Sequence, residues 1–226
     1  GGTDKFAMSE MLQLGYVPLE GTIHPNVYKV PAGGMISVAL LGHEIGKVKH
    51  RRWWSYQDCV QKNYGYYSGM DALEIEHQVD MVLRQVVSDQ NVADVPIGAF
   101  LSGGIDSSLV VAYMQEISSQ PIRTFSLGFE NPGYSEIDVA EKVAHELGTT
   151  HQSLVVTPQD AGNIIPDLCE IYDEPFADSS QIPTVLISRL ASQRVKVALS
   201  GDGGDEMFGG YNRYKWAPLL FSTFSW

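Results

Sequence analysis

Two glycine-rich stretches contain the residues whose types and spacing are best suited to chemistry. The first, SGGIDSS at residues 102–108, lies between a short apolar run at 95–101 and a longer one that begins at Leu109. Glycines let backbone N–H groups approach an anion, and a helix start adds unpaired donors with a partial positive charge. A kinase-type phosphate loop would contain a lysine, whereas this stretch has Asp106 instead. A carboxylate beside phosphates indicates a Mg²⁺ ion between them, because Mg²⁺ prefers oxygen ligands.

The second stretch, SGDGGDEMFGGY at residues 200–211, follows an alternating and then apolar run at 195–199. Its carboxylates at Asp202, Asp205 and Glu206 would repel one another unless a cation neutralised them. Ligands of open α/β sheets bind at the carboxyl ends of the strands, so we expect both stretches at that edge. The alternative for each is a polar turn with capping carboxylates at a helix start, which explains one such loop more easily than two.

Alternating strands and helices must position these two stretches. Apolar and amphipathic periods predict helices at 71–89, 107–118, 135–147, 158–171 and 180–193 and strands at 97–101, 122–128, 151–156 and 195–199. This alternation predicts an α/β fold in which a parallel sheet has helices on both faces. Residues 1–42 contain short β-type runs such as 35–40 and no helical period, and the polar and aromatic residues 43–70 indicate a linker.

Composition and charge restrict the class of protein. None of the apolar runs approaches the roughly 20 residues that span a bilayer, and the first residues do not resemble a signal peptide. The net charge of −12 argues against nucleic acid as a partner, and the short basic cluster at 47–52 is interpreted as part of the solvated linker. Cys59 and Cys169 lack the spacing of a metal or redox motif, so we expect a cytoplasmic enzyme.

Together, the two motifs resemble those of the glutamine-dependent asparagine synthetases and their close amidotransferase relatives. These enzymes belong to the ATP pyrophosphatase class with the adenine nucleotide α-hydrolase-like fold. The resemblance extends to four further stretches: LGYVP at 14–18, YKVPAG at 28–33, TFSLGF at 124–129 and DEPFADSSQIPT at 173–184. The first two are similar to the end of the family's N-terminal glutaminase domain, the third to a sheet strand and the last to the acceptor-side segment.

The resemblance implies three regions. Residues 1–42 correspond to the C-terminal part of a glutaminase domain, 43–70 to a linker and 71–226 to the N-terminal portion of the synthetase domain. The family's glutaminase nucleophile is an N-terminal cysteine, whereas this chain begins with Gly1, and the family's synthetase domain extends beyond Trp226. We therefore expect an internal fragment that does not complete the full reaction alone.

The resemblance also implies a site for ATP and Mg²⁺. The residues expected at the nucleotide are Leu101, Ser102, Gly103, Gly104, Asp106, Ser107, Ser108, Leu127, Ser200 and Gly201. Asp106 and Asp205 are the expected Mg²⁺ ligands. Asp202 is the catalytic candidate, because it stands where classical asparagine synthetases have a glutamate implicated in the ammonia step; here the side chain is one methylene shorter. For the two leucines at strand ends, plain core packing is an alternative that is compatible with this role.

The implied reaction is ATP-dependent amide synthesis. A carboxylate attacks the α-phosphorus of ATP to give an acyl-adenylate and pyrophosphate, and glutamine-derived ammonia then displaces AMP. The expected acceptor is the aspartate side chain. Alternatives are another carboxylate, such as a sugar uronate in polysaccharide synthesis, and a catalytically silent nucleotide-binding module. The expected partners are these small molecules, with neither nucleic acid nor membrane, and a homodimer stays an open alternative.

Overall fold

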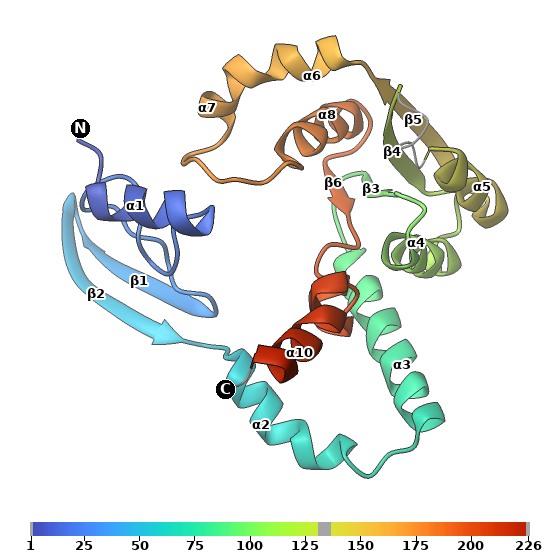
Figure 1. Ribbon diagram of the computed structural model, residues 1–226, viewed down its shortest axis with the longest axis horizontal. Coiled ribbons are helices and arrows are strands. Elements are labelled where there is room, and N and C mark those ends of the chain that lie inside the picture. The colour runs from blue at the N-terminus through green and yellow to red at the C-terminus, as the bar shows by residue number, and fades with distance from the viewer. Residues whose placement is uncertain (1, 131–136, 225–226) are drawn as a thin grey trace. The chain divides into compact units, whose positions relative to one another are not determined.

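The computed structural model describes residues 2–130 and 137–224. The chain divides into two units, one made of Gly1–His77 and Ile165–Ser179 and the other of Gln78–Ile164 and Ser180–Trp226. Helices and strands of both units are drawn in Figure 1. Within the described ranges, no helix is both long and apolar enough to cross a membrane.

A four-stranded parallel sheet forms the centre of the second unit. Its strands are β3 (Ile97–Phe100), β4 (Arg123–Phe129), β5 (Thr150–Val156) and β6 (Val197–Leu199), in the spatial order β5-β4-β3-β6. From β3 the chain runs outward to β4 and then β5, and it later returns to β6 on the other side of β3. The direction of winding therefore reverses at β3, and the loops that follow β3 and β6 emerge side by side.

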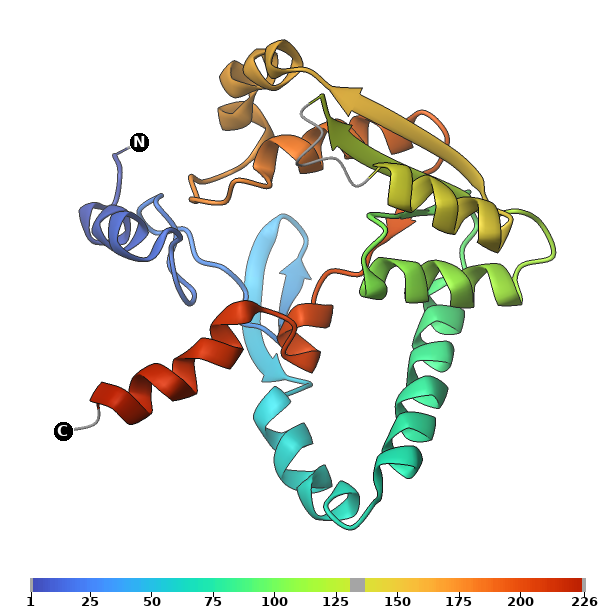
Figure 2. The same ribbon diagram turned by 45° about the vertical axis from the view of Figure 1, so that its right-hand side comes forward.

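Helices cover both faces of this sheet, as the sequence predicts. Ala99 and Leu101 join one buried cluster with apolar residues of α4 (Ile105–Ile117) and α5 (Ile137–Leu147). Phe100, between them, points to the opposite cluster with residues of α8 (Gln181–Ser192). Because side chains alternate along β3, this strand contributes apolar residues to the buried clusters on both faces of the sheet. Figures 1 and 2 show α8 on one side of the sheet and α4 and α5 on the other. The predicted α/β fold class is confirmed.

The remaining helices of residues 71–226 agree with the sequence in part. The helix expected at 71–89 is confirmed as α3 (Ala72–Gln90), and two further helices, α9 (Gly204–Phe208) and α10 (Asn212–Phe224), follow β6. The single helix predicted at 158–171 is wrong. It consists of α6 (Pro158–Ile164), a 3-10 turn at Ile165–Asp167 and α7 (Leu168–Ile171). Pro166 explains the break, since proline lacks the N–H of an inner helical residue and clashes with the preceding turn. The helix expected at 135–147 begins at Ile137 in the described residues, and 135 and 136 lie outside them.

The first unit contains regular elements that the sequence did not predict. Helix α1 (Lys5–Leu14) occurs where no helical period was found. It is bounded by Asp4, whose carboxylate accepts from Phe6 N–H at 2.9 Å, and by Gly15 in the left-handed conformation. Ala7, Met8, Met11 and Leu12 recur at helical spacing, so the sequence does carry a short apolar period here, although only Ala7 is buried.

The stretch predicted as a linker is also regular. Strand β2 (Glu44–Arg52), which includes the basic cluster, pairs antiparallel with β1 (Gly34–Leu41), and α2 (Tyr56–Tyr67) follows it. Figure 2 shows the two strands as a curved hairpin. The predicted boundary between residues 42 and 43 therefore falls inside a hairpin. A polar strand of this kind is stabilised by cross-strand hydrogen bonds, which composition does not reveal.

Packing of α4 against the sheet can be tested at Met114. Its side chain is 0% exposed, and Met114→Ala is expected to lower the free energy of unfolding by about 2–5 kcal/mol because it leaves a cavity. Urea denaturation of the isolated protein measures this. Met81→Ala on α3 is the control, since that side chain is 48% exposed, and it should cost no more than about 0.5 kcal/mol. Equal losses in the two variants would contradict the assignment of Met114 to the core.

Candidate functional site

The loop after β3 holds its shape through glycine geometry and serine hydroxyls. Gly103 has φ +78°, and a Cβ on it would lie 2.9 Å from Val139 Cγ1 at the start of α5. A side chain is therefore excluded both by conformation and by space. The Ser107 hydroxyl is buried and lies 2.9 Å from the Ser102 hydroxyl, and it also accepts from the Ser102 N–H at 3.2 Å. These two serines stabilise the loop itself.

The start of α4 keeps its backbone donors available. Its N-cap is Gly104, and no side chain caps the helix. The first-turn N–H groups of a helix have no intrahelical partner, and with the helix dipole they favour an anion. Ser108 Oγ, in the same turn, is buried without a hydrogen-bond partner among the described residues. The sequence-predicted phosphate loop thus has the geometry of an anion-binding turn.

The loop after β6 lies directly against the first loop. A Cβ on Gly201 would lie 2.6 Å from Ser107 N, and one on Gly204 would lie 2.4 Å from Asp106 Oδ2. Real Cβ atoms are not found at such distances from a backbone nitrogen, so the close approach depends on glycine at Gly201. The structure therefore brings the two predicted motifs together, with the Asp106 carboxylate against the backbone next to Asp205.

The two proposed metal ligands lie at the starts of two different helices. Asp106 lies in the first turn of α4 and Asp205 in the first turn of α9. A Cβ on Gly210 would overlap Asp205 Oδ1, so this carboxylate is turned toward the Gly210 backbone. Among residues 2–130 and 137–224 no cluster of three or more His, Cys, Asp or Glu side chains is placed to hold a metal. Two carboxylates fit Mg²⁺ that takes its other ligands from phosphates and water.

Asp202 and Ser200 form a local turn in the second loop. The Ser200 hydroxyl donates to Asp202 Oδ2 at 3.0 Å and accepts from the Asp202 N–H at 3.3 Å. Asp202 is exposed. Its carboxylate is therefore oriented by Ser200 while it remains open to a ligand.

A second polar group follows this turn and consists of Glu206, Tyr211 and Arg213. The Tyr211 hydroxyl donates to Glu206 Oε1 at 2.7 Å. This hydrogen bond lowers the pKa of the Glu206 carboxyl and raises the pKa of Tyr211. The Arg213 guanidinium stacks over the Tyr211 ring at 4.1 Å from its centroid. The aromatic and guanidinium groups therefore serve to hold the Glu206 carboxylate in its ionised form.

An apolar cavity of about 310 Å³ opens beside the first loop. It is lined by Phe100, Leu101, Ser102, Leu127, Phe129, Pro183, Thr184 and Ile187. Leu101 and Leu127, the two leucines that the sequence suggested for the adenine, both line it. The sequence did not suggest Phe129 or Ile187 as lining residues. Phe129 lies two residues after Leu127 on the same face of β4, so strand alternation could have indicated it, but no local motif marks Ile187. The volume falls in the range of small-ligand pockets.

A parallel sheet with a glycine turn and an acidic loop at its switch point defines a class of α/β domains suited to a phosphorylated ligand. The family model for asparagine synthase matches residues 78–226, which covers the sheet and both loops. The chain therefore belongs to the asparagine synthase family.

Individual relatives agree with this membership. The chain is 35% identical over 225 residues to asparagine synthetase [glutamine-hydrolyzing] 1 of Bacillus subtilis, covering 98% of this chain and 33% of that protein. It is 36% identical over 209 residues to a putative asparagine synthetase [glutamine-hydrolyzing] 2 of Methanocaldococcus jannaschii, covering 92% of this chain and 38% of the relative. The chain thus spans about a third of the length of the curated relatives it matches.

Among solved structures, the chain is similar in fold to the NMN synthetase from Francisella tularensis. The TM-score is 0.43 at 16% sequence identity, and the match covers 61% of this chain and 59% of that one.

The close approach of the two loops can be tested at Gly201. We expect Gly201→Ala to reduce binding of ATP in the presence of Mg²⁺ by at least about tenfold, because the new Cβ would push the second loop away from α4. Isothermal titration calorimetry measures this. The control is Gly162→Ala in α6, where a Cβ meets nothing within 4 Å. Unchanged affinity in Gly201→Ala would show that the contact between the loops does not shape the binding site.

Proposed function

We propose that the chain contributes the nucleotide half of an ATP-dependent amide-forming site that adenylates a carboxylate, with the aspartate side chain as acceptor. One observation carries this proposal: the Asp106 carboxylate lies against Gly204, so a glycine anion turn and an acidic loop share one edge of the sheet. Such a pair suits a triphosphate with a cation better than it suits a neutral ligand. Membership in the asparagine synthase family supports the reaction class.

Each part of the proposed site has a physical task. The N–H groups at the uncapped start of α4 and that of Gly103 would donate hydrogen bonds to the pyrophosphate, which carries the charge that develops as the α-phosphorus is attacked; the Ser102 and Gly104 N–H groups instead bond to serine hydroxyls within the loop. Asp106 and Asp205 would hold Mg²⁺, which when bound would supply positive charge that stabilises the leaving pyrophosphate. The cavity lined by Leu101 and Leu127 accepts the adenine. Ser107 positions the loop rather than the ligand, because its hydroxyl is already bound to Ser102.

Asp202 is proposed to act after adenylation. Ser200 orients its exposed carboxylate, which makes it a suitable acceptor for a proton of the attacking ammonia. Residues 1–42 are proposed to be the end of the glutaminase domain that supplies this ammonia, and the family likeness of the longer relatives supports that division. The pairing of β1 with β2 supports an extension of this proposed region to residue 52.

The cation role is tested with Asp106→Asn and Asp205→Asn in the full-length protein. Each is expected to reduce aspartate-dependent ATP–pyrophosphate exchange by at least about a hundredfold, because transition-state charge loses its counter-ion. Asp94→Asn, an exposed residue before β3 at the opposite edge of the sheet, is the matched control and should keep full exchange. Full activity in both site variants would refute the metal assignment.

The role of Asp202 is tested by separating the two half-reactions. We expect Asp202→Asn to keep ATP–pyrophosphate exchange within about twofold and to lose amide formation from added ammonium by at least about a hundredfold. Equal losses in the two assays would assign Asp202 to adenylation instead. The same exchange assay identifies the acceptor: exchange with a sugar uronate and not with aspartate would overturn the aspartate assignment, and no exchange with any carboxylate would favour the silent module.

A further inference from the structure

A histidine on the edge strand β5 is bound at both ring nitrogens by buried hydroxyls of β4. Thr124 and Ser126 of β4 are 0% and 2% exposed. Thr124 Oγ1 lies 2.9 Å from His151 Nδ1, and Ser126 Oγ lies 3.0 Å from His151 Nε2. The imidazole therefore joins the two strands by side-chain hydrogen bonds, in addition to the backbone ladder between them.

The hydrogen bonds beyond Thr124 determine which nitrogen of His151 carries the proton. Thr149 donates its hydroxyl to the Ala144 carbonyl in the last turn of α5 at 3.4 Å, so its oxygen accepts from the Thr124 hydroxyl at 2.8 Å. The single proton of Thr124 is used there, and Thr124 Oγ1 must accept from His151 Nδ1–H. Nε2 is then the unprotonated nitrogen, and the Ser126 hydroxyl donates to it. The neutral Nδ1–H tautomer thus completes a chain of hydrogen bonds that runs in one direction from Ser126 to α5.

Protonation of His151 would break this chain at Ser126. An imidazolium has a donor at each nitrogen, so the Ser126 hydroxyl would have to accept from Nε2–H instead of donating to Nε2. Its own proton would then need another acceptor, and in residues 2–130 and 137–224 the Ser126 hydroxyl has no hydrogen-bond partner besides His151. Burial of the ring also opposes the charged form and lowers the pKa of His151.

The charged and titratable groups around His151 do not reverse this preference. Glu141 of α5 favours the imidazolium, but its effect on the pKa of His151 is smaller than that of burial. Arg123 of β4 and Arg194 after α8 line a cavity together with His151, and their positive charges oppose its protonation. His145, one turn after Glu141 on α5, is exposed. The neutral ring is therefore the form that the closed strand pair retains.

We propose that His151 is a proton-sensitive fastening of β5: the neutral ring holds this edge strand to β4 and α5, and protonation loosens it. Strand β5 depends on such a fastening because in the described sheet it has a hydrogen-bonded neighbour on one side only. The role is independent of the reaction that the candidate site performs.

The direction of the pH effect follows from the two states of the strand. In the opened state, His151 takes up a proton with the ordinary histidine pKa of about 6.5. In the closed state its pKa is lower, so the opened state binds more protons as the pH falls below about 6.5. The closed state is therefore fully favoured above this pH and loses stability as the pH falls from there toward the pKa of the closed state.

Hydrogen exchange of the full-length protein, followed by mass spectrometry, measures the opening of β5 directly. After correction for the intrinsic exchange rate, we expect protection of the amides at 150–156 to fall about three- to tenfold between about pH 7.5 and about pH 5.5. His151→Asn keeps a donor near the position of Nδ1–H but does not titrate, so its protection should change by less than about twofold over the same range. The matched control is His145→Asn, which removes a histidine side chain that is 87% exposed, and it should behave as the wild type does.

The wild-type profile decides the question even if His151→Asn does not fold. Wild-type protection at 150–156 that does not change with pH would overturn the inference, and so would an equal fall in His151→Asn. Strand β3, which has no titratable side chain, is the internal reference. An equal loss of protection in β3 would indicate general destabilisation by acid and would also overturn the assignment to His151.

Discussion

The site depends on a contact between two backbones. The loop after β6 lies so close to the start of α4 that a Cβ on Gly201 would reach 2.6 Å from Ser107 N. This contact places the Asp106 carboxylate against the acidic loop, and it requires that β3 and β6 be neighbours. Glycine is needed in the second loop because the approach leaves no volume for a side chain, and in the first because Gly103 also has a positive φ.

The strand order of the sheet makes β3 and β6 neighbours. Because the chain winds from β3 outward to β5 and returns to β6, two loops separated by about a hundred residues in sequence end at one edge. The two buried clusters keep the strands in this order, since β3 contributes Ala99 to one cluster and Phe100 to the other, and Leu101, directly after β3, joins the first.

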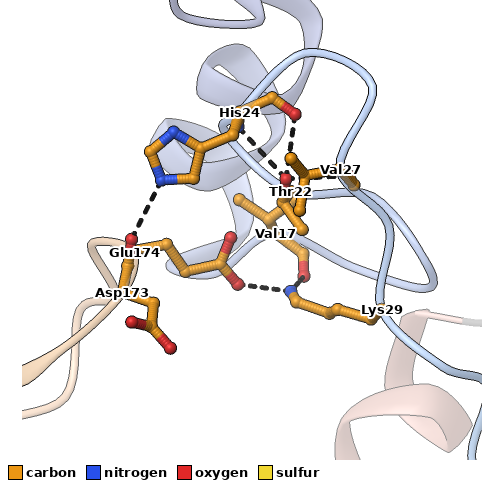
Figure 3. Close-up of polar contacts among 7 residues, drawn as sticks. All are labelled: Val17, Thr22, His24, Val27, Lys29, Asp173 and Glu174. Atoms are coloured by element: carbon orange, nitrogen blue, oxygen red, sulfur yellow. Dashed lines mark hydrogen bonds and ion pairs between the residues drawn. The ribbon is translucent and has the colours of Figure 1, made fainter. Parts of the chain in front are cut away.

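The N-terminal unit adds a second level of organisation. The end of α1, the turn at 22–27 and Lys29 contact an irregular segment at 173–177 through a backbone hydrogen bond, a histidine and an ion pair, the last two of which are drawn in Figure 3. Such contacts specify position more than they contribute stability, because a partly desolvated pair recovers little beyond its desolvation cost. The segment is thus defined by a few directional interactions at each end, while the strands are defined by continuous packing.

The sequence by itself determined the α/β class, the two glycine-rich loops and the strands that lead into them, because local periodicity and turn chemistry both point there. We did not predict α1, although Asp4 and Gly15 mark its ends and four apolar residues between them recur at helical spacing, because this helix is short and lies among Gly- and Pro-containing runs. The sequence also did not reveal β2, which depends on cross-strand hydrogen bonds to β1. Three contacts were decided only by the tertiary structure: that of Gly201 with Ser107, that of Ile187 with the other residues of the cavity, and that of Lys29 with Glu174. In each case the residues are far apart in sequence, and local patterns do not encode such contacts.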